Sequence, residues 1–234
     1  MSNRLRIFSR ANNLNSNSFK KRDRRWPVEW VDGAYISLKP IVEFSVVMIT
    51  FPLWGSMVFA LWLLVKLSEP AIPAFFCQQR TGLRGKRFTL YKLRTMVSSA
   101  AAMQARFSAY NLTTDSPNDF KMANDPRVTK LGRVLRSSHL DELPQLVNVL
   151  LGDMSIVGPR PSTIPASEYK TTWLPRLTVR PGLTGLAQIN RAECHDFGAR
   201  AQLDIEYIRN QSLWLDIWIV WRTAIVALIE RKGI

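Results

Sequence analysis

The longest uninterrupted apolar stretch of the chain runs from Phe44 to Val65 and contains no charged residue. At a rise of about 1.5 Å per residue, a helix over this stretch would be roughly 33 Å long, which is enough to cross a bilayer. Pro52 and Gly55 stand in its middle, where a proline interrupts helical hydrogen bonding and bends the helix. Residues 38–66 are therefore predicted to form a membrane helix that is broken near Pro52.

Basic residues lie on both sides of this stretch and bear on its topology. Residues 1–37 are polar and basic and are expected to form a flexible arm, because they bury little apolar surface. Further cations follow at Lys66 and between Arg80 and Arg94. Since positive residues favour the cytoplasmic side, a re-entrant helix that turns at Pro52 and leaves on the side it entered suits both flanks. An ordinary kinked span is the alternative, and a buried helix of a soluble protein fits this length less well.

The pattern after residue 66 predicts an α+β domain that is mainly helical. Strand-like residues from Ala74 to Met96, with glycines at positions 82 and 85 between them, predict a small β-hairpin. Helical patterns are expected over four further stretches: Val97–Tyr110, Val128–Arg136, Asp141–Leu151 and, in two pieces, Ala201–Glu230.

The last helical stretch carries Trp214, Trp218 and Trp221 on one face. Such a stripe is either part of a core or an aromatic face at a membrane interface, and the apolar stretch elsewhere in the chain favours the interfacial amphipathic helix. Charges at Asp216 and Arg222 argue against a second membrane span.

Charge and composition restrict the possible partners. The chain has 234 residues, with 32 Lys and Arg against 18 Asp and Glu, and a formal net charge of +14. This excess suits a nucleic acid, an anionic membrane surface or a phosphorylated substrate. Two cysteines are too few for a disulfide framework and indicate a reduced, cytosol-facing chain. Neither a zinc-ligand spacing nor a glycine-rich nucleotide-binding motif is present.

The candidate chemistry centres on two adjacent carboxylates, Asp141 and Glu142. Ser138 is expected to cap the helix that begins there, and Pro144 is tolerated in a first turn, where amides lack intrahelical partners. First-turn acids often do no more than complement the helix dipole. Nearby cations favour a catalytic role for these acids. Phosphoryl transfer through an aspartyl-phosphate type of intermediate requires a carboxylate nucleophile beside phosphate-binding cations. These cations are Arg127, Lys130, Arg133, Arg136 and Arg160.

Further candidates for phosphate binding lie on either side of the carboxylates. Lys92 and Arg94 are two residues apart on the second predicted strand, so they share one face and could clamp a diphosphate or remain solvated. Arg160 stands between Pro159 and Pro161, which would hold it on a stiff segment with little conformational freedom to lose on binding. A rigid surface turn is the alternative for this segment.

Six motifs carry these residues, and they are spread over the chain from about residue 38 to the C-terminus. They are Phe-Phe-x-Gln-x-Arg-x-Gly at 75–82, Tyr-Lys-x-Arg-Thr-Met at 91–96, Asp-Pro-Arg-Val-Thr at 125–129, Leu-Asp-Glu-Leu-Pro-Gln at 140–145, Met-Ser-Ile-Val-Gly-Pro-Arg-Pro at 154–161 and Pro-Gly-Leu-Thr-Gly-Leu-Ala-Gln at 181–188. With these motifs the chain closely resembles the bacterial sugar transferase family, the monotopic polyprenyl-phosphate phosphoglycosyl transferases.

The resemblance implies transfer of a sugar-1-phosphate from a UDP-sugar to undecaprenyl phosphate, the initiating step of surface-glycan assembly. It implies Mg²⁺ as cofactor, membrane lipids as surroundings, and a location at the cytoplasmic face of the bacterial inner membrane, with no nucleic acid as partner. Asp141 would attack the sugar-linked phosphorus and release UMP, and the lipid phosphate would then attack the phosphosugar-enzyme. Glu142 would position the metal or handle a proton, and both carboxylates are tentative magnesium ligands.

The same resemblance implies roles for other residues. Lys92, Arg136 and Arg160 match family positions that line the phosphate site, and Asp204 matches a late acidic position near it. With Arg94 they make up the predicted substrate- and phosphate-binding set. Residues 67–234 would be a cytoplasmic catalytic domain that ends in an interfacial helix, preceded by the re-entrant helix that the family uses.

Two departures from the family pattern stand out. Phe51 precedes Pro52 where many relatives have a serine, so a hydroxyl that could satisfy the freed backbone groups is missing unless Thr50 replaces it. His139 lies two residues before Asp141, where a less ionisable residue is common, and could make activity sensitive to pH. The competing hypothesis is a basic, membrane-anchored binding or scaffold protein in which the two acids only cap a helix; such a protein would tolerate Asp141→Asn.

Overall fold

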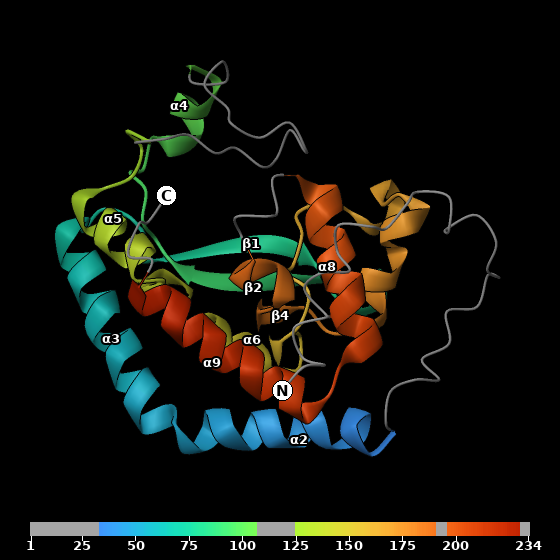
Figure 1. The fold of residues 1–234 in the computed structure, drawn as a ribbon. Coiled ribbons are helices and arrows are strands. Elements are labelled where there is room, and N and C mark those ends of the chain that lie inside the picture. The colour runs from blue at the N-terminus through green and yellow to red at the C-terminus, as the bar shows by residue number, and fades with distance from the viewer. Residues whose placement is uncertain (1–32, 107–124, 191–195, 230–234) are drawn as a thin grey trace.

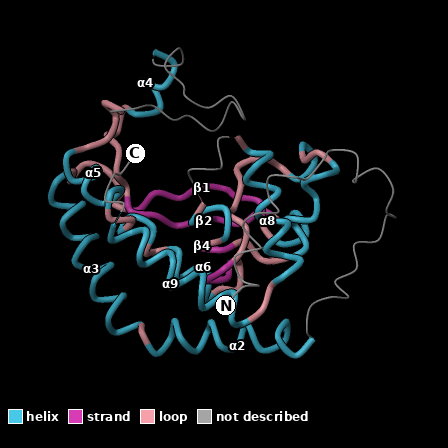
Figure 2. Tube along the Cα trace, viewed as in Figure 1, coloured by secondary structure: helices cyan, strands magenta, loops and turns pink. Residues whose placement is uncertain are grey.

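The computed structural model describes residues 33–106, 125–190 and 196–229. This part of the chain is mainly helical, with two small two-stranded sheets (Figure 1). Figure 2 shows the strands in the interior of the fold and the long helices α2 and α3 on its outside. The predicted α+β class with a mainly helical content is confirmed at this level.

The elements have the following bounds, where η marks a short 3₁₀ segment. They are α2 (Gly33–Ile49), α3 (Phe51–Ser68), β1 (Phe75–Thr81), η3 (Leu83–Gly85), β2 (Arg87–Leu93), α4 (Ala100–Arg106), α5 (Lys130–Ser137), η5 (Leu140–Glu142), α6 (Gln145–Leu150), β3 (Ser155–Val157), η6 (Ala166–Glu168), η7 (Thr171–Thr178), β4 (Gly182–Thr184), α7 (Leu186–Ile189), α8 (Phe197–Asn210) and α9 (Leu213–Ile229).

Helices α2 and α3 form a bent pair with Thr50 at the bend (Figure 1). Pro52 is the second residue of α3, where its missing N–H has no intrahelical partner to lose. The Thr50 hydroxyl donates to the Val46 carbonyl oxygen at 2.7 Å, but this oxygen already accepts from the Thr50 N–H at 3.0 Å, so the hydroxyl does not replace a lost backbone bond. Near the bend, Trp54 Nε1 donates to the Val47 carbonyl oxygen at 2.9 Å. Helix α2 already begins at Gly33, so residues 33–37 belong to this helix, and the rest of the predicted arm lies outside the described residues.

The hairpin predicted between Ala74 and Met96 is confirmed. Strands β1 and β2 pair antiparallel over their whole length, from Phe75 opposite Leu93 to Thr81 opposite Arg87. The inward side chains of β2 join a core cluster with α2, α3 and α6: Phe88 and Leu90 with Val47, Trp54, Val149 and Met154. Burial of this strand face therefore fixes the hairpin against the bent helix pair.

A second sheet, which was not predicted from the sequence, lies directly before the Pro-Arg-Pro segment at residues 159–161. Strand β3 pairs parallel with β4, Ser155 opposite Gly182 and Val157 opposite Thr184. The two backbone segments approach so closely that a Cβ on Gly182 would collide with the backbone nitrogen of Gly158. Glycine is therefore required where the strands meet, which explains its place in both motifs.

The expected helix from Asp141 to Leu151 is wrong at its start. The Ser138 hydroxyl donates to the Val134 carbonyl oxygen at 2.7 Å, so this serine closes α5 and does not cap the next helix. His139 then adopts a left-handed conformation with φ of 57°, which turns the chain. Asp141 and Glu142 follow in η5, and α6 begins only at Gln145, after Pro144.

The C-terminal helical region divides into α8 and α9, as predicted. The tryptophan stripe divides as well, because Trp218 packs against a core cluster while Trp214 and Trp221 are exposed. Helix α4 covers the middle of the predicted 97–110 helix, and residues 107–110 lie outside the described part. Large exposed apolar side chains are concentrated on α2, α3 and α9.

Gly132 provides a test of the packing of α5. A Cβ at this position would collide with the Thr95 carbonyl oxygen, whereas a Cβ on Gly33 would meet nothing within 4 Å. We expect Gly132→Ala to destabilise the fold by about 2 kcal/mol, because α5 must shift away from the Thr95 backbone, and Gly33→Ala to change stability by less than about 0.5 kcal/mol. Thermal unfolding of both detergent-solubilised variants would measure this, and equal melting temperatures would contradict the packing.

Candidate active site

Three segments that are distant in sequence meet at the Asp141–Glu142 turn. Strand β2 contributes Lys92, helix α5 contributes Arg136, and the segment after β3 contributes Arg160. A cavity lies elsewhere, between α2, η7 and α8, and neither carboxylate lines it. The turn is instead accessible on the side of Arg160, whose side chain is 44% exposed.

Glu142 is the centre of an ion bridge. Its Oε1 accepts from Lys92 Nζ and from Arg160 Nη2, both at 2.6 Å, and its Oε2 accepts from Arg160 Nη1 at 3.4 Å. Burial alone would raise the pKa of Glu142, but Arg160 and Lys92 together hold this pKa well below its usual range. A carboxylate that is ionised at every working pH does not exchange protons near neutrality. Of the two roles predicted for Glu142, the geometry thus favours positioning.

Asp141 is a different kind of carboxylate. Its side chain is buried and forms no hydrogen bond with any residue that the structure describes. Burial raises the pKa of Asp141, which Lys92, Arg136 and Arg160 counteract through their positive charge. A desolvated carboxylate without hydrogen-bond donors has its lone pairs available to an electrophile, as a nucleophile needs.

Arg136 flanks Asp141 on the side of α5. Its Nε donates to Thr95 Oγ1 at 2.9 Å, and burial lowers the pKa of its guanidinium, which Asp141 raises. Arg127, another cation near the turn, forms an ion pair with Asp125 at 2.6 Å. Of the predicted cations, Lys92, Arg136 and Arg160 therefore act on Asp141, whereas Lys130 and Arg133 are exposed on α5.

The structure does not bring Arg94 to this cluster. Its Nε donates to the Pro73 carbonyl oxygen at 2.7 Å, and its guanidinium lies over the Phe76 ring. Strand β2 ends at Leu93, so the alternation that would have put Arg94 on the face of Lys92 no longer applies.

Asp204 reaches the site only through another residue. It is fully buried and accepts from Arg176 Nε at 2.8 Å, and Arg176 Nη2 donates to the backbone oxygen of Arg160 at 2.9 Å. Asp204 thus anchors Arg176, and Arg176 anchors the Arg160 backbone. The sequence reasoning missed Arg176, because nothing local distinguishes it from a surface arginine.

The donor set fits Mg²⁺ only in part. Among the described residues, no three His, Cys, Asp or Glu side chains gather around one point. Mg²⁺ usually takes one or two protein carboxylates and completes its shell with water and substrate phosphates. Asp141 has oxygens available for this, whereas both Glu142 oxygens already face cations. A magnesium site here would depend on the phosphates of a substrate.

The opposite pKa shifts of the two acids predict opposite effects on stability. Because the pKa of Asp141 is raised in the folded protein, its ionised form costs folding free energy near pH 7, and this cost disappears as the pH falls through that pKa. Asp141→Asn should therefore raise the melting temperature at pH 7 by about 2–4 °C, the effect of about 1 kcal/mol at this chain length. The gain should vanish near pH 4.

Glu142→Gln is the matched control for this prediction. The lowered pKa of Glu142 means that its charge stabilises the fold above its unfolded pKa, so the amide should lower the melting temperature at pH 7. Thermal unfolding of both variants over pH 4–8 would measure the effect. A fall in melting temperature for both at pH 7 would contradict the assignment of Asp141 as the destabilising charge.

The sequence of the chain is similar to those of several known proteins. The chain is 40% identical over 176 residues to the undecaprenyl-phosphate galactose phosphotransferase of Salmonella typhimurium, which covers 74% of this chain and 37% of that protein. It is 42% identical over 171 residues to the UDP-glucose:undecaprenyl-phosphate glucose-1-phosphate transferase of Caulobacter vibrioides, covering 69% of this chain and 58% of that protein. It is 38% identical over 173 residues to the exopolysaccharide production protein ExoY of Rhizobium meliloti, covering 72% and 75% respectively.

The match to a family model is broader. The model described as "Bacterial sugar transferase" matches residues 34–230 and so includes all three described parts of the chain. The chain spans well under half the length of the Salmonella relative, and the match to ExoY covers most of both proteins. By its motifs, its family match and these relatives, the chain belongs to the bacterial sugar transferase family.

Proposed function

We propose that the protein transfers a sugar-1-phosphate from a UDP-sugar to undecaprenyl phosphate, the step that initiates assembly of a surface glycan. The observation that carries this proposal is the state of Asp141, a buried carboxylate without hydrogen bonds among the described residues, beside three cations. The relatives named for undecaprenyl phosphate support the acceptor, and their different sugars leave the sugar open.

In the first step an Asp141 oxygen attacks the sugar-linked phosphorus of the donor. A bond forms between that oxygen and phosphorus, the bond from phosphorus to the bridging oxygen breaks, and UMP leaves. In the second step an oxygen of undecaprenyl phosphate attacks the same phosphorus, and the carboxylate of Asp141 is released. Two displacements at one phosphorus predict ping-pong kinetics.

Lys92, Arg136 and Arg160 would neutralise the charge that the phosphates bring in and that moves during transfer. Glu142 holds Lys92 and Arg160 close to Asp141 in the absence of substrate, so these cations are already in place. The donor's diphosphate would then take over their contacts with Glu142. Mg²⁺, held by Asp141, Glu142 and donor phosphates, would further neutralise the leaving phosphate.

The bent pair of α2 and α3 would hold the protein at the cytoplasmic face of the inner membrane as a re-entrant element. Helix α3 is, among the described residues, the helix long and apolar enough to cross a membrane, with a mean hydropathy of 1.5. The residues around the bend are the most exposed apolar ones of the pair, Ile49 at 78% and Leu53 at 73%. The bend would therefore lie deepest in the lipid, with Trp214 and Trp221 of α9 in the interface.

Intact-protein mass spectrometry tests the covalent step. Purified protein would be incubated with Mg²⁺ and a panel of UDP-sugars, without lipid acceptor, beside the Asp141→Asn variant. We expect a mass gain of one sugar-phosphate in the wild type only, with the donor that reacts naming the sugar. UMP release that needs undecaprenyl phosphate, without an adduct, would overturn the two-step mechanism. Neither adduct nor UMP with any donor would support the scaffold hypothesis.

Lys92 and Arg94 give a second test, because they are close in sequence and differ in position. Lys92→Ala should slow adduct formation by about 100-fold, in the range seen when one transition-state charge contact is removed. Arg94→Ala should change the rate by less than about threefold, since surface changes away from the site have small effects. Quenched time courses of adduct mass would measure both rates, and equal losses would contradict the placement of Arg94.

A further inference from the structure

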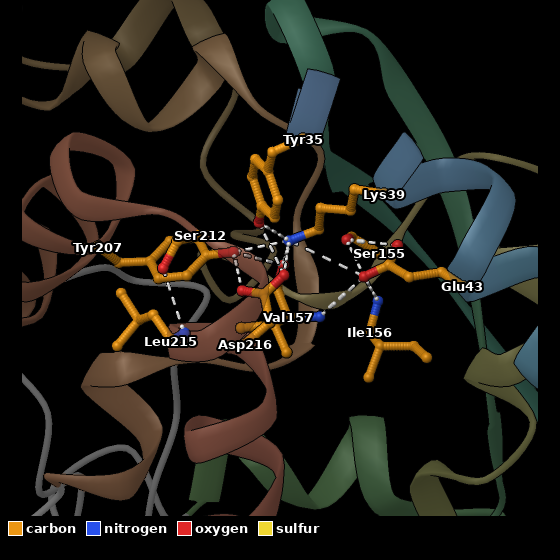
Figure 3. A network of polar contacts seen from close by, with 10 residues as sticks. All are labelled: Tyr35, Lys39, Glu43, Ser155, Ile156, Val157, Tyr207, Ser212, Leu215 and Asp216. Atoms are coloured by element: carbon orange, nitrogen blue, oxygen red, sulfur yellow. Dashed lines mark hydrogen bonds and ion pairs between the residues drawn. The ribbon is translucent and has the colours of Figure 1, made fainter. Parts of the chain in front are cut away.

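Helix α2 carries two charged residues on the side that faces the protein, although the rest of its surface is largely apolar (Figure 3). Glu43 is buried, and its carboxylate contacts strand β3. Ser155 Oγ donates to both of its oxygens at 2.7 Å, and the backbone N–H groups of Ile156 and Val157 donate to Oε1 at 3.0 and 3.5 Å. One carboxylate of α2 thus binds successive amides of the strand.

Lys39, one turn earlier on α2, binds the same strand at a carbonyl oxygen. Its Nζ donates to the Val157 carbonyl oxygen at 2.9 Å, to Asp216 Oδ2 of α9 at 2.8 Å and to Tyr207 OH of α8 at 2.7 Å. Tyr207 OH in turn donates to Asp216 Oδ1 at 2.7 Å. Figure 3 shows these side chains converging on Val157 from three elements. The peptide groups of this residue are therefore fixed by charged partners at both N–H and C=O.

The chain from Val157 to Arg160 is short and stiff. Gly158 N–H donates to the Thr184 oxygen at 2.9 Å, and the Pro159 oxygen accepts from Gly182 N–H at 2.9 Å. Proline rings fix φ at 159 and 161, so the link has few soft torsions. We therefore expect a displacement of Val157 to reach Arg160, the residue that contacts Glu142, through this stiff link, in addition to the anchoring of the Arg160 backbone by Arg176.

Hydrophobic packing alone could dock α2, as Val47 does in the core cluster. Burying a lysine and a glutamate is costly unless both are fully paired, so it adds little net stability, and its best-attested use is to fix one register. Because Lys39 and Glu43 are one turn apart, a slide of α2 by one turn would place Lys39 at the N–H groups that Glu43 binds, or Glu43 at the carbonyl oxygen that Lys39 binds, so each charge would meet the wrong partner. The pairs therefore specify where α2 sits along the strand.

We propose that Lys39 and Glu43 are positioning residues for Arg160, which couple the register of the apolar helix α2 to the geometry of the active site. They touch no reacting atom and act through β3. The catalytic part of this inference rests on the proposed function, whereas the coupling from α2 to the strand does not.

Hydrogen exchange tests the coupling without any activity. Glu43→Gln keeps the shape of the side chain and removes the charge that binds the amides of β3. We expect exchange in a peptide covering residues 155–162 to rise by about tenfold, the loss expected for one charge-assisted hydrogen bond. Val47→Ala is the control, since it removes apolar contacts of α2 in the core cluster and leaves every hydrogen bond between α2 and β3 in place. Unchanged exchange in Glu43→Gln, or an equal rise in both variants, would overturn the proposal.

A double-mutant cycle tests the catalytic consequence. Glu43→Gln should slow adduct formation by about tenfold when Arg160 is present. In an Arg160→Ala background the same substitution should slow it by less than about twofold, because residues that act through one another have non-additive effects. Val47→Ala should have the same effect in both backgrounds. If the losses from Glu43→Gln and Arg160→Ala simply multiply, Glu43 does not act through Arg160. Should Glu43→Gln not fold, Ser155→Ala, which removes only one donor to Glu43, takes its place in both experiments.

The two proposals fail separately. An absence of adduct in the wild type would overturn the proposed function and leave the exchange result to decide the coupling. An adduct in the wild type, with multiplicative losses and unchanged exchange, would leave the function and remove the positioning role.

Discussion

The ion bridge from Glu142 to Lys92 and Arg160 is the contact on which the arrangement of the site depends. It joins a hairpin strand, a short turn and the segment after a parallel strand, and it adds to the direct link between hairpin and segment in which Thr81 N–H donates to the Ser162 oxygen at 2.9 Å. Two cations would repel each other at this separation without an anion between them. Because Glu142 supplies that anion, the neighbouring Asp141 can remain buried and without hydrogen bonds among the described residues.

The sequence was informative where its pattern is local. One face of β2 is buried, so apolar and polar residues alternate along it and the hairpin can be predicted from that pattern. The helix break can be predicted from Pro52, because a proline has no backbone N–H to donate. The start of the helix after Asp141 was not readable in this way. Its position depends on the left-handed backbone of His139, a conformation that stays uncommon for every residue other than glycine, although histidine is among the residues enriched in it.

Long-range pairs explain the remaining differences. Arg176 and Asp204 lie on different elements, and only the fold makes them partners. In the sequence, Lys39 and Glu43 stand just before the apolar stretch that begins at Phe44, so they resemble exposed residues at the end of a membrane helix. In the structure both are paired with β3. Strands β3 and β4 have three residues each, too few for alternation to be recognised. Arg94 was placed by extending a strand one residue beyond its end.

Glu142 is already paired with Lys92 and Arg160, and this pairing affects which anions the site can bind. An incoming anion does not meet an empty cationic surface; it must outcompete a carboxylate that is already part of the protein and is held at 2.6 Å from both partners. A ligand with a single phosphate brings little more charge than this resident competitor, whereas a diphosphate can engage Lys92 and Arg160 at once. Under the proposed function, the built-in anion would therefore favour a diphosphate donor over inorganic phosphate or a free sugar phosphate as the first ligand to bind, before the lipid monophosphate reacts.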